Sequence, residues 1–268
     1  MEKIYTEMIA FMVSSGKRIA TKAGKIKDIG VKKQWLTEED IAIERGMKEI
    51  IQKHHPNHAF FAEEEHDSFP ENENVWIADP ISGTRTFIDG LPHYGIVVAY
   101  SKNNVVYFGA VYDPAVDELF VAYKGKGAFL NGNKISVSNQ DKKVVFNLSK
   151  SLKDEKSAQE ILEKLQQFDL SINRNSHAVN LCHVACGRYD GGITFGKDSF
   201  PMFAGALMIQ EAGGRFTNSK GKENIHHSDR VFIGGNKKTY PQLWKILQQD
   251  KPLPPQIHNP SFLSISFI

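Results

Sequence analysis

Between residues 75 and 123 the sequence runs through four short apolar and β-branched segments that are separated by turn residues. The segments are VWIAD, YGIVVAYS, VVYFGAVYD and DELFVAYK, with Asn103-Asn104 and Asp113-Pro114 between them. Segments of this length, joined by turns of hairpin length, are typical of an antiparallel sheet. We therefore predict that residues 75–79, 94–101, 105–113 and 117–123 share one sheet, which GKGAFLNGNKISVS continues as a further hairpin.

Two helices are predicted before this sheet. Ile4, Met8, Phe11 and Ile19 recur at roughly helical spacing over residues 3–22. Thr37, with Asp40 three residues on, resembles a capping box that starts a second helix ending at His55-Pro56. A short strand, AFFA, then runs into three glutamates. We expect the two helices to lie on one face of the sheet.

After about residue 140 the pattern changes to alternating strands and helices. It predicts strands at VVFNLSK and RVFIGG, and helices at 154–168, in 179–192 ending at Gly187, at 200–214 and at 239–249. We divide the chain into an N-terminal half (1–140) that carries the metal and phosphate motifs, a C-terminal half (141–250) that contributes substrate contacts, and a Pro-rich tail (251–268). The tail's SFLSISFI could pack on the body or in a dimer interface.

Composition excludes several classes of function. Thirty-three Lys and Arg residues oppose 31 Asp and Glu, a net charge of +2, so no global field favours nucleic acid or an anionic membrane. Two cysteines do not make a disulfide framework, and a reducing cytoplasm is the expected location. No apolar run reaches the ~20 residues that span a bilayer, and the N-terminus lacks the order of a signal peptide. We expect an enzyme or a binding protein.

Carboxylates end two predicted strands about 15 residues apart. Glu63, Glu64 and Glu65 follow AFFA, and Asp79 follows VWIA. Each alone could be a solvated turn, but together they suit a hard divalent cation, which prefers oxygen ligands. Gly83-Thr84 then offers backbone N–H groups at a possible helix start, which is a ready anion site.

Five motifs, in this order and spacing, resemble the inositol monophosphatase-like family: TEED, AEEE, WIADPISGTRTF, RNSHAVNLCHVACGRYDGG and FAGALMIQEAGG. The resemblance covers roughly residues 5–250. It implies a mixed α+β or α/β fold, a layered αβαβα sandwich of the inositol monophosphatase and fructose-1,6-bisphosphatase type. It also implies a homodimer that hydrolyses small phosphorylated metabolites with Mg²⁺.

The resemblance implies roles for individual residues. The metal ligands would be Glu63, Asp79 and the carbonyl of Ile81, with Ser82 at the position of a further ligand. Thr84 would orient the attacking water, Asp40 would position Thr84, and Glu63 would complete the catalytic set. Substrate contacts would come from the segment around the phosphate cradle and from the start of a later helix, namely Ile81, Ser82, Gly83, Thr84, Ser176 and His177. Asp190 also matches that later segment.

Two departures concern the metals. Ser82 stands where the family has Asp, and Phe200-Pro201 stand where it has Trp-Asp, so two metal-ligand aspartates are replaced. We therefore predict one tightly bound divalent ion, held by Glu63, Asp79 and the Ile81 carbonyl, and a weak second one at most. Asp198 or Glu64 could substitute as a ligand.

Other candidate sites have simpler interpretations. Cys182, His183 and Cys186 have metal-like spacing, but on a helix they are expected in the core. His54, His55 and His58 flank Pro56 and are interpreted as a surface turn. The loop KIKDIGVKK could bring Lys32 or Lys33 to a phosphate.

Two functions remain open from the sequence. The first is metal-dependent hydrolysis of a phosphate monoester by a metal-activated water. The second is a catalytically degenerate member that binds a phosphorylated ligand or a protein partner without turnover, and Ser82 and Pro201 motivate it. Thr194 replaces a glutamate that binds the inositol ring in some members, while GTRTFIDGLP resembles histidinol-phosphate phosphatases. Nucleotide and sugar phosphates stay open as substrates.

Overall fold

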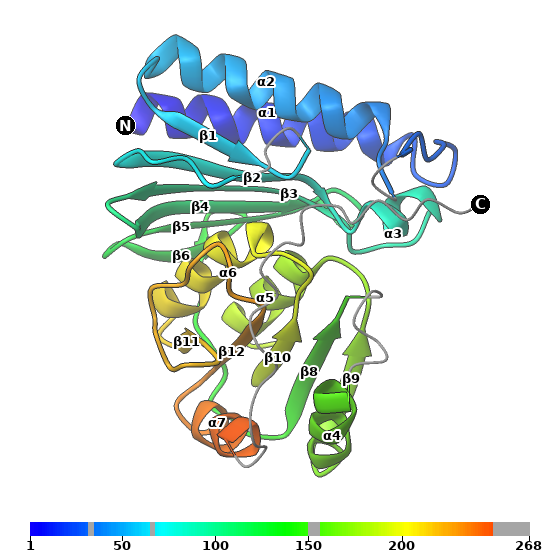
Figure 1. Cartoon of the computed structure of the whole chain (residues 1–268), viewed down its shortest axis with the longest axis vertical. Helices are drawn as coiled ribbons and strands as arrows, with labels where there is room; N and C mark the ends of the chain where they lie inside the picture. The colour runs from blue at the N-terminus through cyan, green and yellow to red at the C-terminus, as the bar shows by residue number, and fades with distance from the viewer. Residues whose placement is uncertain (32–34, 65–67, 150–155, 249–268) are drawn as a thin grey trace, which may run out of the picture.

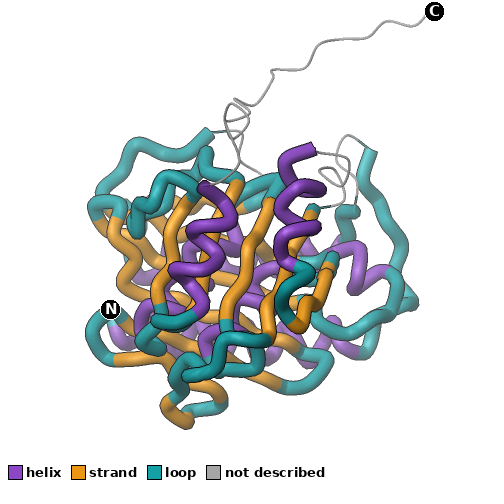
Figure 2. The backbone as a smooth tube through the Cα atoms, turned by 90° about the horizontal axis from the view of Figure 1, so that it is seen from below, coloured by secondary structure: helices purple, strands orange, loops and turns teal. Residues whose placement is uncertain are grey.

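A computed structural model describes residues 1–31, 35–64, 68–149 and 156–248. Its elements stack in five layers (Figure 1). The outer helices α1 (Glu2–Ala20) and α2 (Glu38–His54) lie on a seven-stranded sheet, and α5 (His177–Ala185) and α6 (Phe200–Glu211) lie beneath it. A five-stranded sheet follows, and α4 (Lys156–Leu165) and α7 (Thr239–Gln248) cover its outer face (Figure 2). This order confirms the predicted αβαβα sandwich.

The first sheet follows chain order from one edge to the other. Its strands β1 and β2 pair in parallel, and every later neighbour is antiparallel. The strands are β1 (Ala59–Ala62), β2 (Asn74–Ser82), β3 (Gly95–Lys102), β4 (Val105–Asp113), β5 (Glu118–Tyr123), β6 (Gly127–Leu130) and β7 (Asn133–Lys134). The four predicted strands therefore share one sheet, and the glycine-rich segment after them forms the expected hairpins.

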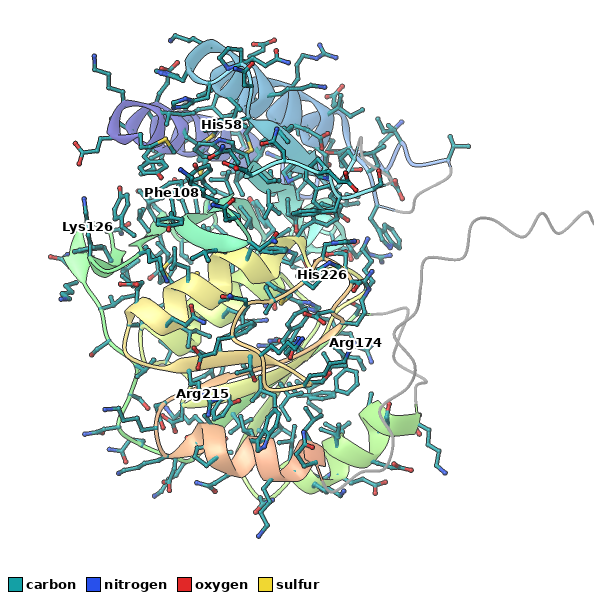
Figure 3. All side chains as sticks on the ribbon, turned by 60° about the vertical axis from the view of Figure 1, so that its left-hand side comes forward. His58, Phe108, Lys126, Arg174, Arg215 and His226 are labelled. Atoms are coloured by element: carbon teal, nitrogen blue, oxygen red, sulfur yellow. The ribbon has the colours of Figure 1, made fainter. Side chains whose placement is uncertain are left out.

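Both faces of this sheet are buried, which explains its unbroken apolar runs. In β3, Ile96 and Val98 pack with the core under α1 and α2, whereas Val97 and Ala99 pack with α5 and α6. Phe108 of β4 lies under α1, where Tyr5 stacks on it with ring centroids 4.2 Å apart (Figure 3).

The second sheet has the order β11-β12-β10-β8-β9. Its strands are β8 (Lys143–Leu148), β9 (Asp169–Asn173), β10 (Gly191–Phe195), β11 (Arg215–Asn218) and β12 (Val231–Gly235). The patterns at 144–150 and 230–235 predicted β8 and β12, but β9, β10 and β11 were missed. In β10 the glycines allow close packing, since a Cβ on Gly192 would lie 2.6 Å from Cγ1 of Val145.

Local signals set the helix ends as predicted. Asp40 Oδ2 accepts the Thr37 N–H at 2.8 Å, which is the reciprocal bond of the capping box. Gly187, with φ +79°, follows the end of α5. Pro201 lies in the first turn of α6, where its missing N–H costs nothing. Even α6, buried from Pro201 to Ile209, is too short to cross a membrane, and no other helix in the described part of the chain is long and apolar enough to do so.

Candidate active site

The predicted carboxylates meet because β1 and β2 are parallel and in register. Ala62 of β1 pairs with Ala78 of β2. The next residue along the chain is Glu63 after Ala62 and Asp79 after Ala78. Residues that pair across parallel strands have side chains on the same face of the sheet, so the side chains of Glu63 and Asp79 lie next to each other on one face. Asp79 is buried and Glu63 is largely buried.

After Asp79 the strand leaves its regular ladder. The register between β2 and β3 shifts between Asp79 and Ser82, where Pro80 has no N–H to donate. The shift brings the Ile81 carbonyl to the start of the short helix α3 (Thr84–Ile88), where it accepts the Thr84 hydroxyl at 2.7 Å. In Figure 1, α3 lies at the right-hand edge, beyond the end of β2.

Thr84 also faces Asp40, although the two residues are distant in sequence. Thr84 Oγ1 lies 3.4 Å from Asp40 Oδ1. The other carboxylate oxygen, Oδ2, accepts both the backbone N–H and the hydroxyl of Thr37, at 2.8 and 2.5 Å. Burial raises the pKa of Asp40 to about 7; Glu64 and Glu63 add to the rise, and the Thr37 bonds oppose it. Asp40 is therefore a fixed carboxyl that can exchange a proton near neutral pH.

Gly83 joins this region to the start of α5. It has φ +83°, a left-handed conformation that favours glycine, and a Cβ there would lie 2.9 Å from the Ser176 nitrogen. Ser176 donates its N–H to the His93 carbonyl at 3.0 Å, and its hydroxyl accepts the Val179 N–H at 3.3 Å as the cap of α5. The predicted substrate residues Gly83, Thr84 and Ser176 thus lie side by side.

His177 begins α5 and is half-buried. Burial, with a contribution from the charge of Lys197, lowers the pKa of His177 to about 4. Its imidazole is therefore neutral at physiological pH and can donate or accept one hydrogen bond at each nitrogen, according to its tautomer.

Lys197 was missed by the sequence reasoning. It follows β10, and its Nζ lies 3.0 Å from Glu63 Oε1 and 4.0 Å from Asp198 Oδ2. Burial alone would lower the pKa of Lys197, but Glu63, Asp198 and Asp79 together raise it above its ordinary value. A long side chain on a loop has no periodicity, so its destination is not visible in the sequence.

The donors near this ammonium suit a single divalent cation. Glu63 and Asp79 supply carboxylates and Ile81 a carbonyl, which are the oxygen ligands that Mg²⁺ prefers. Ser82 adds only a hydroxyl, and Pro201 adds no side-chain donor. Within the described ranges, no three His, Cys, Asp or Glu side chains group into a ready metal site. These donors are of the kind that one Mg²⁺ prefers.

Several other candidates lie in structural roles. Cys182 is a buried free thiol in the core beside α6, as expected. His58 is not part of a simple surface turn: it accepts the Trp76 indole N–H at 3.2 Å and stacks on Tyr100. Thr194 is buried and accepts a hydrogen bond from Asn147 at 3.0 Å. Lys32, Lys33, Glu65 and the tail 251–268 lie outside the described residues.

Asp190 also has a structural role in the described contacts. Its Oδ2 accepts the N–H groups of Lys142 and Lys143, both at 2.8 Å, and its Oδ1 accepts the Ser138 hydroxyl. Asp190 precedes β10, whereas Lys197 follows it, so the two are separated by a five-residue strand of roughly 17 Å. The motif match at Asp190 thus reflects a turn at the opposite end of the strand.

The chain is similar to known proteins of one family. The model of the inositol monophosphatase family matches residues 2–251. The fructose-1,6-bisphosphatase/inositol-1-monophosphatase of Thermotoga maritima is 34% identical over 206 residues, covering 76% of this chain and 79% of that protein. The Nus factor SuhB of Pseudomonas aeruginosa is 30% identical over 233 residues, or 82% and 85%. A solved IMPase structure from Thermotoga maritima has a TM-score of 0.80 at 29% identity, over 93% of this chain and 98% of that one.

Proposed function

The chain belongs to the inositol monophosphatase family of metal-dependent phosphatases, and from this premise we propose that it hydrolyses a small phosphate monoester. The observation that carries the proposal is the pair of Thr84 and Asp40 beside the carboxylates of Glu63 and Asp79. Thr84 Oγ1 is within 3.4 Å of a carboxyl whose pKa is raised to about 7. Such a group can take up a proton at neutral pH.

The Thr84 hydroxyl has one proton and two nearby acceptors. It donates to the Ile81 carbonyl at 2.7 Å, and Asp40 Oδ1 lies at 3.4 Å. When Asp40 is ionised, it can draw that proton towards itself, and Thr84 Oγ1 then accepts a proton from the attacking water. Turning the hydroxyl also releases the Ile81 carbonyl as a ligand. The Thr84 side chain thereby couples the orientation of the attacking water to the availability of the Ile81 carbonyl as a metal ligand.

The divalent cation, proposed to be Mg²⁺, would be held by Glu63, Asp79 and the Ile81 carbonyl. When bound, such an ion polarises a phosphate oxygen and makes water a better nucleophile. The N–H groups at the start of α3, at Gly83 and Thr84, have no partner inside the helix and would donate to the phosphate. Ser176 and His177 would contact the rest of the substrate.

The substrate is proposed to be a metabolite with one esterified phosphate. Thr194 offers no carboxylate for an inositol ring and is already held by Asn147. A panel of inositol, histidinol, nucleotide and sugar monophosphates, assayed with Mg²⁺ for released phosphate, would rank these classes. We further propose that the protein is a homodimer located in the cytoplasm. Light scattering on the purified chain tests the dimer.

Substitution of Thr84 tests the proposed mechanism. Thr84→Val keeps the shape and removes the hydroxyl, so kcat should fall by roughly 10²–10⁴, whereas Thr84→Ser should retain most activity. Thr217→Val is the matched control, because Thr217 is also buried and its hydroxyl bonds Tyr240 at 2.8 Å, far from the site. Equal kcat in Thr84→Val and wild type would refute the role of the hydroxyl.

A second candidate is binding without turnover. It is favoured by Ser82 and Pro201, which leave fewer carboxylates than the family motif, and by the Lys197–Glu63 ion pair. A protein that binds inositol phosphate or another monoester by calorimetry, yet releases no phosphate from any panel member across Mg²⁺ concentrations, would support this candidate over hydrolysis.

A further inference from the structure

Lys197 brings a positive charge to the place where the carboxylates converge. Its Nζ lies 3.0 Å from Glu63 Oε1 and 4.0 Å from Asp198 Oδ2, and Asp79 also interacts with its charge. The Lys197 side chain is 49% exposed, whereas that of Glu63 is 12% exposed. The lysine therefore reaches Glu63 from the solvent side, from which a substrate would arrive.

The backbone around Lys197 is fixed at three points. Gly196 donates its N–H to the Arg230 carbonyl at 2.8 Å, and Lys197 donates its own N–H to Ser149 Oγ at 3.0 Å. The Ser199 hydroxyl donates to the His227 carbonyl at 2.9 Å. These bonds hold the turn between β10 and α6, so the direction of the Lys197 side chain is built into the fold. An isolated surface ion pair lacks such support and contributes little.

The charges of the site account for one divalent ion. The carboxylates of Glu63, Asp79 and Asp198 carry three negative charges, and the ammonium of Lys197 cancels one of them. These three carboxylates and the ammonium sum to −2, which one Mg²⁺ neutralises; Glu64 and Asp40 lie on the other side of Glu63 and add negative charge where they are ionised, and Arg230 faces Asp198. Positions 82 and 201, where the family motif has aspartates, are neutral here, so a second divalent ion would be uncompensated.

We propose that the ammonium of Lys197 takes the place of a second metal ion: it binds Glu63, donates to a phosphate oxygen of the substrate, and leaves room for one divalent cation. This inference rests on the proposed phosphate chemistry. A carboxylate can bind an ammonium with one oxygen and a cation with the other, so both charges can share Glu63. Lys197 would then be a catalytic residue.

The ammonium would act by its charge and its N–H donors only. During hydrolysis a bond forms between phosphorus and the water oxygen, and the bond from phosphorus to the leaving oxygen breaks. One proton passes overall from the water to the leaving oxygen. Lys197 keeps all its protons throughout, and its charge stabilises the phosphate oxygens as negative charge develops on them.

The test uses Lys197→Met, which keeps an unbranched side chain one atom shorter and removes its charge. Lys197→Arg keeps the charge with a different shape. Lys53→Met is the matched control, because Lys53 also pairs with a glutamate, Glu7, at 2.7 Å, but at the far end of α2. Circular dichroism confirms folding of each variant.

Two binding measurements judge the proposal without any catalytic assay. At saturating Mg²⁺, inorganic phosphate should bind the wild type and Lys197→Arg, and its affinity should fall at least fivefold in Lys197→Met. Calorimetric titration with Mg²⁺ should give one ion in the wild type and at least tenfold tighter binding in Lys197→Met, because a like charge next to the ligands is gone. Lys53→Met should match the wild type in both.

Each outcome separates this inference from the proposed hydrolysis. Two tight Mg²⁺ sites in the wild type, or unchanged phosphate and Mg²⁺ affinities in Lys197→Met, would overturn the role of Lys197 even in an active phosphatase. The expected binding changes in a protein that hydrolyses no monoester would support the role of Lys197 as a phosphate ligand while refuting hydrolysis.

Discussion

The α-carbon of Gly83 lies so close to Ser176 that a β-carbon on Gly83 would be 2.9 Å from the Ser176 backbone nitrogen. Gly83 starts α3 at the end of the first sheet, and Ser176 caps α5 in the layer below. Their contact therefore fixes the distance between two backbone segments that both border the candidate site. Only a residue without a side chain permits it.

Substitution of Gly83 by alanine should damage both stability and activity. The left-handed φ costs roughly 1–2 kcal/mol for an alanine, and the contact with Ser176 must also open. Gly213→Ala is the control, since Gly213 has φ +86° and a β-carbon on it would have nothing within 4 Å. Urea unfolding should show a loss of about 1–2 kcal/mol for Gly213→Ala and a larger one for Gly83→Ala. Full phosphate affinity in Gly83→Ala would contradict the proposed cradle.

Asp40 should make the protein less stable as pH rises. Its folded pKa of about 7 exceeds the unfolded value near 3.9, so the folded state binds the extra proton between these values. The free energy of unfolding should therefore fall from about pH 4 to pH 7, by about 4 kcal/mol at most, and then level off. Below pH 4 Asp40 is protonated in both the folded and the unfolded state, so the free energy of unfolding no longer changes with pH through this group.

Asp40→Asn isolates this effect. An asparagine can still accept the Thr37 bonds and can donate to Thr84, but it cannot take a proton. In EDTA, the variant should lose the decline between pH 4 and 7 and should be at least as stable as wild type at pH 8, while its phosphatase activity is abolished. Parallel stability curves for the two proteins in urea titrations across pH would contradict the raised pKa.

Much of the N-terminal half follows from local sequence signals. Apolar runs between turn residues predict the strands between 75 and 123. Thr37 and Asp40 predict the start of α2, and the structure contains the hydrogen bond between them. By contrast, β11 has four residues and β10 begins with two glycines, so neither carries a strand pattern. Their strand state comes from neighbouring strands, which a single sequence does not display.

Some residues of the candidate site could likewise be predicted from the sequence, and others could not. Glu63 and Asp79 could be expected together, because each stands at the end of a predicted strand, and the parallel pairing of β1 with β2 places the two residues side by side. Lys197 could not, because the direction of its side chain depends on a turn whose N–H groups donate to Ser149 Oγ and to the Arg230 carbonyl. Asp190 matches the same motif segment as Ser176 and His177, whereas its contacts tie it to the start of β8.

Asp190 should therefore matter for folding and not for turnover. Asp190→Ala removes the acceptor of the Lys142 and Lys143 N–H groups, at a cost of about 0.5–1.5 kcal/mol for each hydrogen bond lost. Chemical unfolding should show this loss, and kcat/KM of the folded protein should stay within twofold of wild type. A stable variant with a raised KM would instead show that Asp190 contacts the substrate.

Restoring the aspartates of the family motif should create room for a second ion only when Lys197 is also removed. Ser82→Asp with Pro201→Asp adds two negative charges, and an acid at position 201 suits the first turn of α6. The double variant should bind Mg²⁺ more tightly than either single variant, since both positions are proposed to face the same ion. It should still bind mainly one ion, because the ammonium occupies the other place. Adding Lys197→Met to the double variant should give two bound ions.

The double Asn variant at the same positions is the control for shape without charge. Calorimetry counts the ions, and the rise in melting temperature with Mg²⁺ gives an independent affinity, because an ion that binds the folded state stabilises it. Equal Mg²⁺ affinities in the Asp and Asn double variants would mean that positions 82 and 201 no longer face a cation, and the binding protein without turnover would then be the better account of this chain.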